Sequence, residues 1–411
     1  MSDALPPSPT VTRVLRGELC TGCGLCAGVA GDAIRMISEA PGYSRPRLMG
    51  ATPARAEQVI AAACPGAVVQ SWTGSERVHP YWGPWRQVFT GAATAPGVRF
   101  EASSGGAISA LLIHALETGL VDRVLHIAAD PADPTRNALA VSRTATEVIA
   151  RSGSRYTASS PLAEIDAALG EGGSMAFVGK PCDASALRRL AGVDPRVARH
   201  VPLIMSFFCG GIPSHDGVGR ILKALEVEPA SVTAFRFRGR GWPGNCVAER
   251  SDQPPAEMTY ARSWGDYLSK EVQFRCKICP DAVGGAADIA CADAWYGDEG
   301  GYPSFDEADG RSLIVARTEI GERLLRQALE AGALAAEPLD IGQIDRMQPS
   351  QARRKRLVLA RVAALPLLLQ PWPTMAGLWV AAAALRAPPL EALRNFVGTL
   401  RRTLQGRRSR L

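Results

Sequence analysis

The pattern of hydrophobic and polar positions changes about one fifth of the way along the chain. In the first 75 residues, short apolar runs are interrupted by Gly, Pro and charged residues, which predicts a loop-rich segment. From residue 88 onwards, apolar runs alternate with stretches in which apolar residues recur every three or four positions. These are the patterns of buried strands and amphipathic helices. The sequence therefore predicts an α/β body after a small N-terminal segment.

Two stretches of the body repeat one pattern. Residues 174–191 and 201–225 each predict a strand, a turn that carries a cysteine, and a helix. The cysteines are Cys182 and Cys209. Because open α/β sheets bind ligands beyond the carboxyl ends of their strands, we expect both thiols at a ligand-binding edge.

Other parts of the body give simpler predictions. Residues 103–119 predict a helix, residues 121–128 a strand, and residues 312–332 a strand followed by a helix. Residues 234–242 alternate, with Phe235 and Phe237 on one face and Arg236, Arg238 and Arg240 on the other. The arginine face is either a site for anionic groups or a solvated strand face.

Composition and charge divide the chain further. Its 411 residues, 46% hydrophobic and 21% charged, are typical of a globular protein with two or three domains. We expect an N-terminal segment at residues 1–75, the α/β body at 76–350 and a basic helical tail at 351–411. The tail carries 12 basic residues and one acid, Glu391, so the net charge of +6 conceals a mildly acidic body.

The tail is apolar as well as basic. Its longest run without charge or proline, residues 374–385, is far shorter than the roughly 20 residues that span a bilayer. With Trp372 and Trp379 nearby, the tail either contacts an anionic membrane surface peripherally or forms a helical hairpin packed on the body. No helix-turn-helix or aromatic-interleaved basic motif is present, so we expect no nucleic-acid partner.

The strongest chemical signal is a group of cysteines near the N-terminus. Cys20, Cys23 and Cys26 are each separated by two residues, and Cys64 is followed by proline, as in bacterial ferredoxins. This first cysteine set predicts a [4Fe–4S] cluster; the alternative is a structural zinc site. The clustering of cysteines and the absence of a signal-peptide pattern indicate a reducing, cytoplasmic environment.

A second cysteine set is more dispersed and comprises Cys182, Cys209, Cys276 and Cys279. From spacing alone, the Cys276/Cys279 pair is a redox dithiol, a zinc knuckle or half of a cluster site. The lone cysteines at the two strand ends are equally typical of small buried hydrophobic residues. Cys246 and Cys291 are not spaced from other cysteines as metal ligands usually are, and we expect them to be structural.

A phosphate-binding loop is predicted at the start of the helix in residues 103–119. Ser103, Ser104, Gly105 and Gly106 leave backbone N–H groups accessible at a helix N-terminus, which suits a diphosphate. Small residues begin many helices, so the pattern alone is weak.

Taken in order, these motifs resemble those of the coenzyme F420 hydrogenase/dehydrogenase beta subunit family, which includes reductases of chlorophyll-type pigments. The resemblance extends from about Cys20 to Asp340 and rests on the ferredoxin-type cysteines, the loop at 103–106, and the segments around Cys182, Cys209, residues 235–242 and residues 276–295. It implies an iron–sulfur flavoprotein with FAD in the α/β body. It also implies that the second cysteine set binds a second [4Fe–4S] cluster.

The resemblance assigns roles to further residues. It implies that the loop at 103–106, Arg155 and Tyr156 contact the flavin, and Arg238 is the candidate from the arginine face. The expected function is an oxidoreductase that relays electrons between a ferredoxin or partner redox subunit, the clusters, FAD and a small organic substrate such as coenzyme F420. The alternative is a non-catalytic electron-transfer subunit of a larger complex. Catalytic residues are not assigned; Asp293 and Tyr156 are candidate proton donors.

Overall fold

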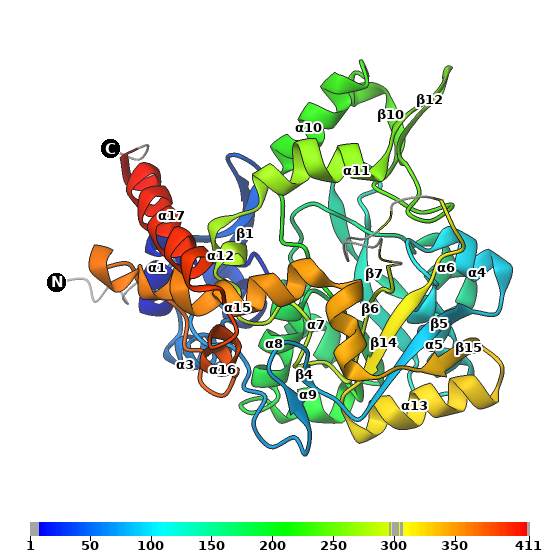
Figure 1. Cartoon of the computed structure of the whole chain (residues 1–411), viewed down its shortest axis with the longest axis horizontal. Helices are drawn as coiled ribbons and strands as arrows, with labels where there is room; N and C mark the ends of the chain where they lie inside the picture. The colour runs from blue at the N-terminus through cyan, green and yellow to red at the C-terminus, as the bar shows by residue number, and fades with distance from the viewer. Residues whose placement is uncertain (1–7, 296, 298–303, 305–306, 409–411) are drawn as a thin grey trace.

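The computed structural model describes residues 8–295, 297, 304 and 307–408 (Figure 1). At its centre is a mixed eight-stranded sheet in the order β15-β5-β14-β13-β9-β8-β6-β7. The four strands β13, β9, β8 and β6 run parallel, and the remaining neighbours are antiparallel. The sheet comprises β5 (Gln87–Ala93), β6 (Arg123–Ala129), β7 (Asn137–Ser142), β8 (Met175–Val178), β9 (Leu203–Phe207), β13 (Ile289–Asp293), β14 (Ser312–Ala316) and β15 (Leu334–Pro338).

Helices cover both faces of the sheet because its strands present apolar residues on both sides. Along β8, Ala176 faces one core, which α5 and α13 cover, whereas Met175 and Phe177 face the other, which α7, α8 and α9 cover. The body helices are α4 (Pro96–Glu101), α5 (Ala107–Glu117), α6 (Ala145–Ala150), α7 (Ile165–Gly170), α8 (Pro181–Leu190), α9 (Pro195–His200), α10 (His215–Ala224) and α13 (Glu319–Glu330). The helices and strands predicted at residues 103–119, 121–128, 174–191, 201–225 and 312–332 are confirmed, whereas the alternating strand at 234–242 ends at Arg236.

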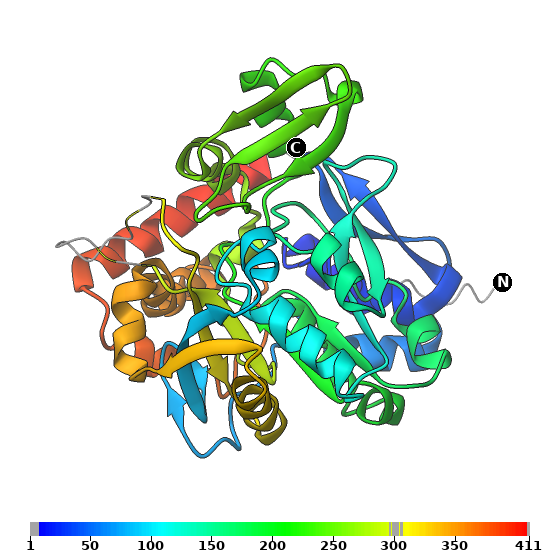
Figure 2. The ribbon, with the colours of Figure 1, turned by 90° about the vertical axis from the view of Figure 1, so that its right-hand side faces the viewer.

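A smaller antiparallel sheet stands apart from the central one (Figure 2). It contains β10 (Val232–Arg236), β11 (Cys246–Arg250) and β12 (Gln253–Met258), and α10 packs against it. Phe235 and Phe237 are both buried in this cluster, as their alternation predicts. The chain then passes through α11 (Tyr260–Arg262) and α12 (Phe274–Lys277) back to the central sheet.

The N-terminal segment is more regular than the sequence predicts. It contains α1 (Pro9–Arg16), α2 (Leu25–Ala30), a hairpin of β1 (Ile34–Glu39) and β2 (Tyr43–Leu48), and α3 (Ala54–Ala63). Each of these helices and strands is short and buries only a few apolar residues, so the sequence shows no long periodic pattern there. A two-stranded connector of β3 (Val78–His79) and β4 (Gly83–Pro84) leads into the body.

The C-terminal region packs on the body at several points. It contains α14 (Ile344–Met347), α15 (Pro349–Ala363), α16 (Val380–Ala384) and α17 (Pro389–Arg408). Leu357 and Val358 of α15 are fully buried, and α16 and α17 both contact α15. Among the described residues, no helix has both the length and the apolarity to cross a membrane.

Candidate functional site

The structure brings the first cysteine set together from two segments. Cys20 and Cys23 lie in the loop after α1, Cys26 lies in α2, and Cys64 follows the end of α3. Burial, together with the nearby Cys20 thiol, raises the pKa of the Cys64 thiol to about 11. The pKa of Cys26 is also raised by burial and by the other three thiols. Four thiols in one buried group form a donor set that suits a [4Fe–4S] cluster.

Glycines beside the first cysteine set allow two backbone segments to pack closely. Gly24 has a φ of +87° at the start of α2, and a Cβ there would lie 2.6 Å from the backbone nitrogen of Ala163. A Cβ on Gly28 would lie 2.3 Å from the carbonyl oxygen of Leu162. The glycines therefore let α2 approach the segment before α7 closely.

The second cysteine set is assembled at the carboxyl ends of the parallel strands. Cys182 begins α8 just after β8, Cys209 follows β9, and Cys276 and Cys279 lie in and just after α12. Burial raises the pKa of Cys209 to about 12, and the Cys276 and Cys279 thiols lie close enough to affect it. The pKa of Cys182 is likewise raised by burial, and the Cys209 and Cys276 thiols contribute to the rise. Cys276 is buried and the other three cysteines are partly buried, and together the four thiols form a donor set that suits a cluster.

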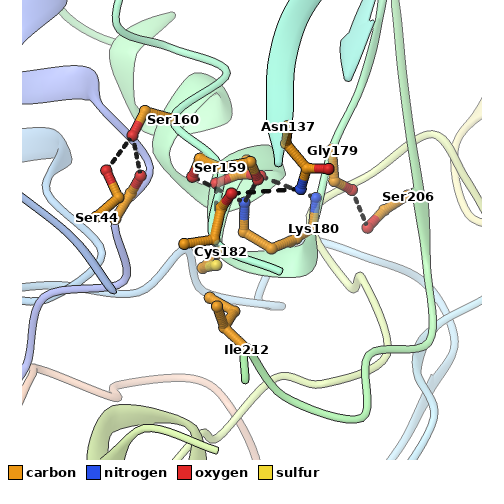
Figure 3. Close-up of polar contacts among 12 residues, drawn as sticks. Ser44, Asn137, Ser159, Ser160, Gly179, Lys180, Cys182, Ser206 and Ile212 are labelled. Carbon is orange, nitrogen blue, oxygen red and sulfur yellow. Dashed lines mark hydrogen bonds and ion pairs between the residues drawn. The ribbon is translucent and has the colours of Figure 1, made fainter. Parts of the chain in front are cut away.

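Polar groups surround the second cysteine set. Lys180 forms an ion pair of 2.7 Å with Asp183 and donates a hydrogen bond of 2.9 Å to Ser159 Oγ. Figure 3 shows Lys180 and Cys182 on the same turn, with Ser159 beside the ammonium group. Burial opposes the charge of Lys180, but Asp183 and the Cys182 and Cys209 thiols together outweigh it and raise the pKa of the ammonium. The backbone N–H of Ile212 lies 3.4 Å from Cys276 Sγ.

The C-terminal helix α15 also holds the second cysteine set in place. Gln351 Nε2 donates a hydrogen bond of 3.0 Å to the carbonyl oxygen of Cys209, and Arg354 Nη1 donates one of 2.8 Å to the same oxygen. Lys355 lies over the ring of Trp72, 3.8 Å from its centroid, and donates to the carbonyl oxygen of Pro280. Sequence reasoning missed these contacts because a run of basic residues on a helix ordinarily indicates a solvated face.

Arg275 lies between the two cysteine sets. Its side chain is 2% exposed, and Nη2 donates a hydrogen bond of 3.0 Å to the carbonyl oxygen of Pro65, next to Cys64. Its charge opposes the burial-driven rise in the pKa of both Cys64 and Cys276. Within the described residues, no carboxylate forms a salt bridge with Arg275, and its Nε has no hydrogen-bond partner. A buried cation needs nearby negative charge, which metal-bound thiolates would provide.

A cavity of ≈ 280 Å³ opens at the same edge of the sheet. Cys209 of the second cysteine set lies in its wall, together with Lys180 and Cys291. Six of the seven residues predicted to contact a flavin also line it: Ser103, Ser104, Gly106, Arg155, Tyr156 and Arg238. The structure thus places the flavin-site candidates and one predicted cluster ligand around a single space.

The loop at the start of α5 forms part of the cavity wall. Gly106 has a φ of +78° at the N-cap of α5, and no side chain caps the helix. Gly105 lies behind the wall, where a Cβ would be 2.6 Å from the carbonyl oxygen of Gly91. The helix start therefore offers backbone N–H groups to an anion, and the close packing behind it requires glycine. The site residues fit a flavin diphosphate.

Arg155 and Arg238 are both engaged with the protein. Arg155 donates a hydrogen bond of 2.8 Å to Asn137 Oδ1 and further bonds to three backbone carbonyl oxygens. Arg238 forms two hydrogen bonds, of 2.8 and 3.0 Å, with the carboxylate of Asp293, which also accepts one from Trp242. Asp293 is thereby held as an acceptor, an unfavourable arrangement for a proton donor.

Each arginine of the predicted face is paired with a carboxylate, and Arg240 is about half exposed. Arg236 is paired with Glu101 at 2.8 Å, and Arg240 contacts both Glu101 and Glu249 at 3.3 Å. Arg236 and Arg240 line a second cavity of ≈ 440 Å³, so only Arg238 of the three reaches the cavity beside the cysteines. The acidic partners come from distant segments, which alternation along one strand cannot reveal.

All ten cysteines are free of disulfide bonds. The described residues contain no group of three or more His, Cys, Asp or Glu side chains placed to bind a single metal ion. Cys246 is buried in the core of the smaller sheet, whereas Cys291 lies in the wall of the cavity.

Comparison with known families identifies the chain. The family model for the N-terminal part of the coenzyme F420 hydrogenase/dehydrogenase beta subunit matches residues 88–165, and the model for its C-terminal part matches residues 172–341. The chain belongs to this family. The matched ranges contain the second cysteine set and the cavity; the first cysteine set precedes them.

Individual relatives agree with this assignment. The chain is 27% identical over 303 residues to the coenzyme F420 hydrogenase subunit beta of Methanococcus voltae, covering 69% of this chain and 98% of the relative. It is 25% identical over 236 residues to the chloroplastic 7-hydroxymethyl chlorophyll a reductase of Oryza sativa subsp. japonica, covering 57% of this chain and 47% of the relative.

A solved structure shares the fold. A chain of the F420-reducing [NiFe] hydrogenase complex from Methanosarcina barkeri superimposes with a TM-score of 0.55 at 19% identity, covering 72% of this chain and 98% of that one. The mixed α/β architecture is therefore shared with a chain of that complex.

Proposed function

We propose that the protein is an iron–sulfur flavoprotein oxidoreductase. Each cysteine set would hold a [4Fe–4S] cluster, and the cavity beside Cys209 would hold FAD. The observation that carries this proposal is the shared wall: a thiol of the second cysteine set lines the same cavity as the candidate flavin loop. When bound, the clusters supply single electrons, and the flavin couples them to two-electron chemistry.

The residues of the chain would perform three tasks. The start of α5 would bind the flavin diphosphate through its N–H groups. Arg275 would offset the negative charge of both cysteine sets, and Lys180, held by Asp183 at 2.7 Å, would place a cation beside the second. The Arg238–Asp293 pair would fix the far wall of the cavity. A small organic substrate, such as coenzyme F420 or a chlorin, would approach the open side of this cavity.

The electron donor would be a ferredoxin or a partner redox subunit. The first cysteine set lies in the N-terminal segment, and Arg275 links it to the second through Pro65. The first set would thus receive electrons and the second would deliver them towards the cavity. All ten thiols are free, which supports operation in a reducing cytoplasm.

Metal and flavin content tests the proposal directly. We expect about eight irons, eight acid-labile sulfides and one FAD per chain after anaerobic purification, with a visible spectrum that bleaches on addition of dithionite. Zinc without sulfide or flavin would overturn the proposal.

A glycine substitution tests the flavin loop separately. Gly105→Ala would press a methyl group against the carbonyl oxygen of Gly91, whereas Gly97→Ala meets nothing within 4 Å and is the matched control. We expect Gly105→Ala to weaken FAD binding at least tenfold, measured by fluorescence quenching, and Gly97→Ala to leave it unchanged. Equal FAD affinity in both variants would contradict the placement of the diphosphate.

A second candidate function is a non-catalytic electron-transfer subunit. It is favoured by the relatives named as hydrogenase beta subunits and by the solved multi-subunit complex. Turnover of a substrate by the isolated chain with dithionite as reductant would support the enzyme. Cluster and flavin reduction without turnover of F420 or chlorin substrates would support the subunit.

A further inference from the structure

Helix α17 carries an apolar stripe that faces solvent. Four of its side chains are exposed by about half or more: Leu390 by 60%, Leu393 by 58%, Val397 by 53% and Leu404 by 47%. With the half-buried Leu400, they follow one another at alternating intervals of three and four residues, which places them on one side of the helix.

The opposite side of α17 packs on the body. Thr399 and Thr403 are 1% and 8% exposed, and Asn395 accepts a hydrogen bond of 3.0 Å from Arg361 of α15. Figure 1 shows α17 at the edge of the molecule, with the C-terminus at its outer end. The helix is thus anchored along one side and presents the leucines and valine along the other.

Arginines border the exposed stripe. Arg394 and Arg401 are both exposed and follow Leu390 and Val397 by four residues, so they lie on the same side of the helix. The helix has one acid, Glu391, which is paired with Arg353 of α15. The outward face therefore combines apolar side chains with uncompensated positive charge.

This combination selects among the possible occupants. Two copies of α17 packed through their stripes would bring arginine rows together without acidic residues to pair with them, which disfavours a dimer. An anionic lipid surface would accept the apolar side chains among its acyl chains and the arginines among its headgroups. We propose that α17 docks this protein peripherally on an anionic membrane surface.

The structure also indicates which part of the tail would make this contact. In the longest uncharged run of the tail, residues 374–385, Leu378 and Ala383 are buried against the body. Trp379 and Leu385 remain exposed, by 45% and 89%. The continuous amphipathic face lies instead on α17, whose charged residues had obscured it.

Vesicle flotation with the full-length, cofactor-loaded protein tests the proposal. We expect binding to vesicles of phosphatidylcholine with about one third phosphatidylglycerol, no binding to phosphatidylcholine alone, and weaker binding at about 0.5 M NaCl than at about 0.1 M. No binding to the anionic vesicles at low salt would overturn the proposal.

Two pairs of variants identify the face. Val397→Ser should weaken vesicle binding several-fold, whereas Val193→Ser, which alters an exposed valine of the body, should not. The double variant Arg394→Glu/Arg401→Glu should weaken it by roughly tenfold or more. Its control, Arg326→Glu on α13, changes a surface arginine elsewhere. Equal binding by the α17 variants and their controls would overturn the assignment to α17.

Other occupants give different results. A loss of dimer on size-exclusion chromatography in Val397→Ser, without vesicle binding by the wild type, would assign the stripe to a second copy. Salt-sensitive binding of an acidic ferredoxin that the double arginine variant abolishes, again without vesicle binding, would assign it to a protein partner. Either result would overturn the membrane proposal, and neither depends on which substrate the protein reduces.

Discussion

The first cysteine set takes three of its thiols from one short stretch, residues 20–26, whereas the second collects its four from three separate segments. The geometry of the first follows from cysteines three positions apart, and α3 has only to supply Cys64. The second exists only when β8, β9 and α12 have come together. A group of four thiols can therefore be assembled through local spacing or through topology, and spacing along the sequence reveals only the first kind.

The two sets also differ in what supports them. Gly24 and Gly28 let α2 pack closely beside the first set. The second is braced from outside the α/β body, by Gln351 and Arg354 of α15 at the carbonyl oxygen of Cys209. We infer that the second site is more sensitive to changes in distant parts of the chain.

Replacing one ligand in each set should have the largest effect. We expect Cys26→Ser and Cys209→Ser each to lose about half of the iron and sulfide, and Cys209→Ser also to perturb the flavin spectrum, since Cys209 lines the cavity. Iron, sulfide and visible spectra measure this. Cys246→Ser, in the core of the smaller sheet, is the control and should retain all iron. Full iron content in either ligand variant would contradict its assignment.

The role of α15 can be tested by Arg354→Met. It removes the hydrogen bonds to the carbonyl oxygens of Cys209 and Gly210, at a cost on the order of 2 kcal/mol. We expect iron to leave the second site several-fold faster in the presence of a chelator, while the first site is unaffected. Arg353→Met, at the exposed neighbouring position, is the matched control. Equal release rates would show that α15 does not support the site.

Arg275→Gln should change both sites together. Removing a buried positive charge favours the oxidised form of each cluster, so we expect both midpoint potentials to become more negative, by on the order of tens of millivolts. Potentiometric titration followed by electron paramagnetic resonance measures the shift. Arg275→Lys should restore most of it. A fall in iron content with unchanged potentials would indicate a purely structural role.

Arg45→Gln should give the smallest effect and should alter only the first site. Burial raises the pKa of Cys20, and Arg45 opposes this, but its side chain is only half-buried and solvent screens its charge. We expect a smaller negative shift in one midpoint potential, in the same titration. An equal shift in both potentials would show that the charge of Arg45 acts on both sites and not on the first alone.

Much of the body could be predicted from its hydrophobic pattern. The strand and helix around Cys182, those around Cys209 and the helix after Gly106 are long and periodic, so local pattern and tertiary packing agree. The N-terminal helices and hairpin were expected to be loops because each is short and buries only a few residues.

The site was predicted less completely. Ser103, Ser104 and Gly106 do line a cavity with Cys209, but Arg155 is engaged with neighbouring carbonyl oxygens. Arg275 gave no sequence signal, since an arginine beside a cysteine is ordinarily solvated. Its burial depends on the contact with Pro65, which lies 210 residues away along the chain.

The sequence by itself determined the ferredoxin-type spacing of the first cysteine set, the alternation of strands and helices, and the basic apolar character of the tail. These are properties of neighbouring residues, and local geometry governs them. Tertiary structure alone decided that four dispersed thiols form one group, that Arg275 lies between the two sets, and which side of α17 faces solvent. Each of these depends on which segments, distant in the sequence, pack against one another. Burial of a thiol or an arginine is a property of the packed chain, and no short stretch of sequence specifies it.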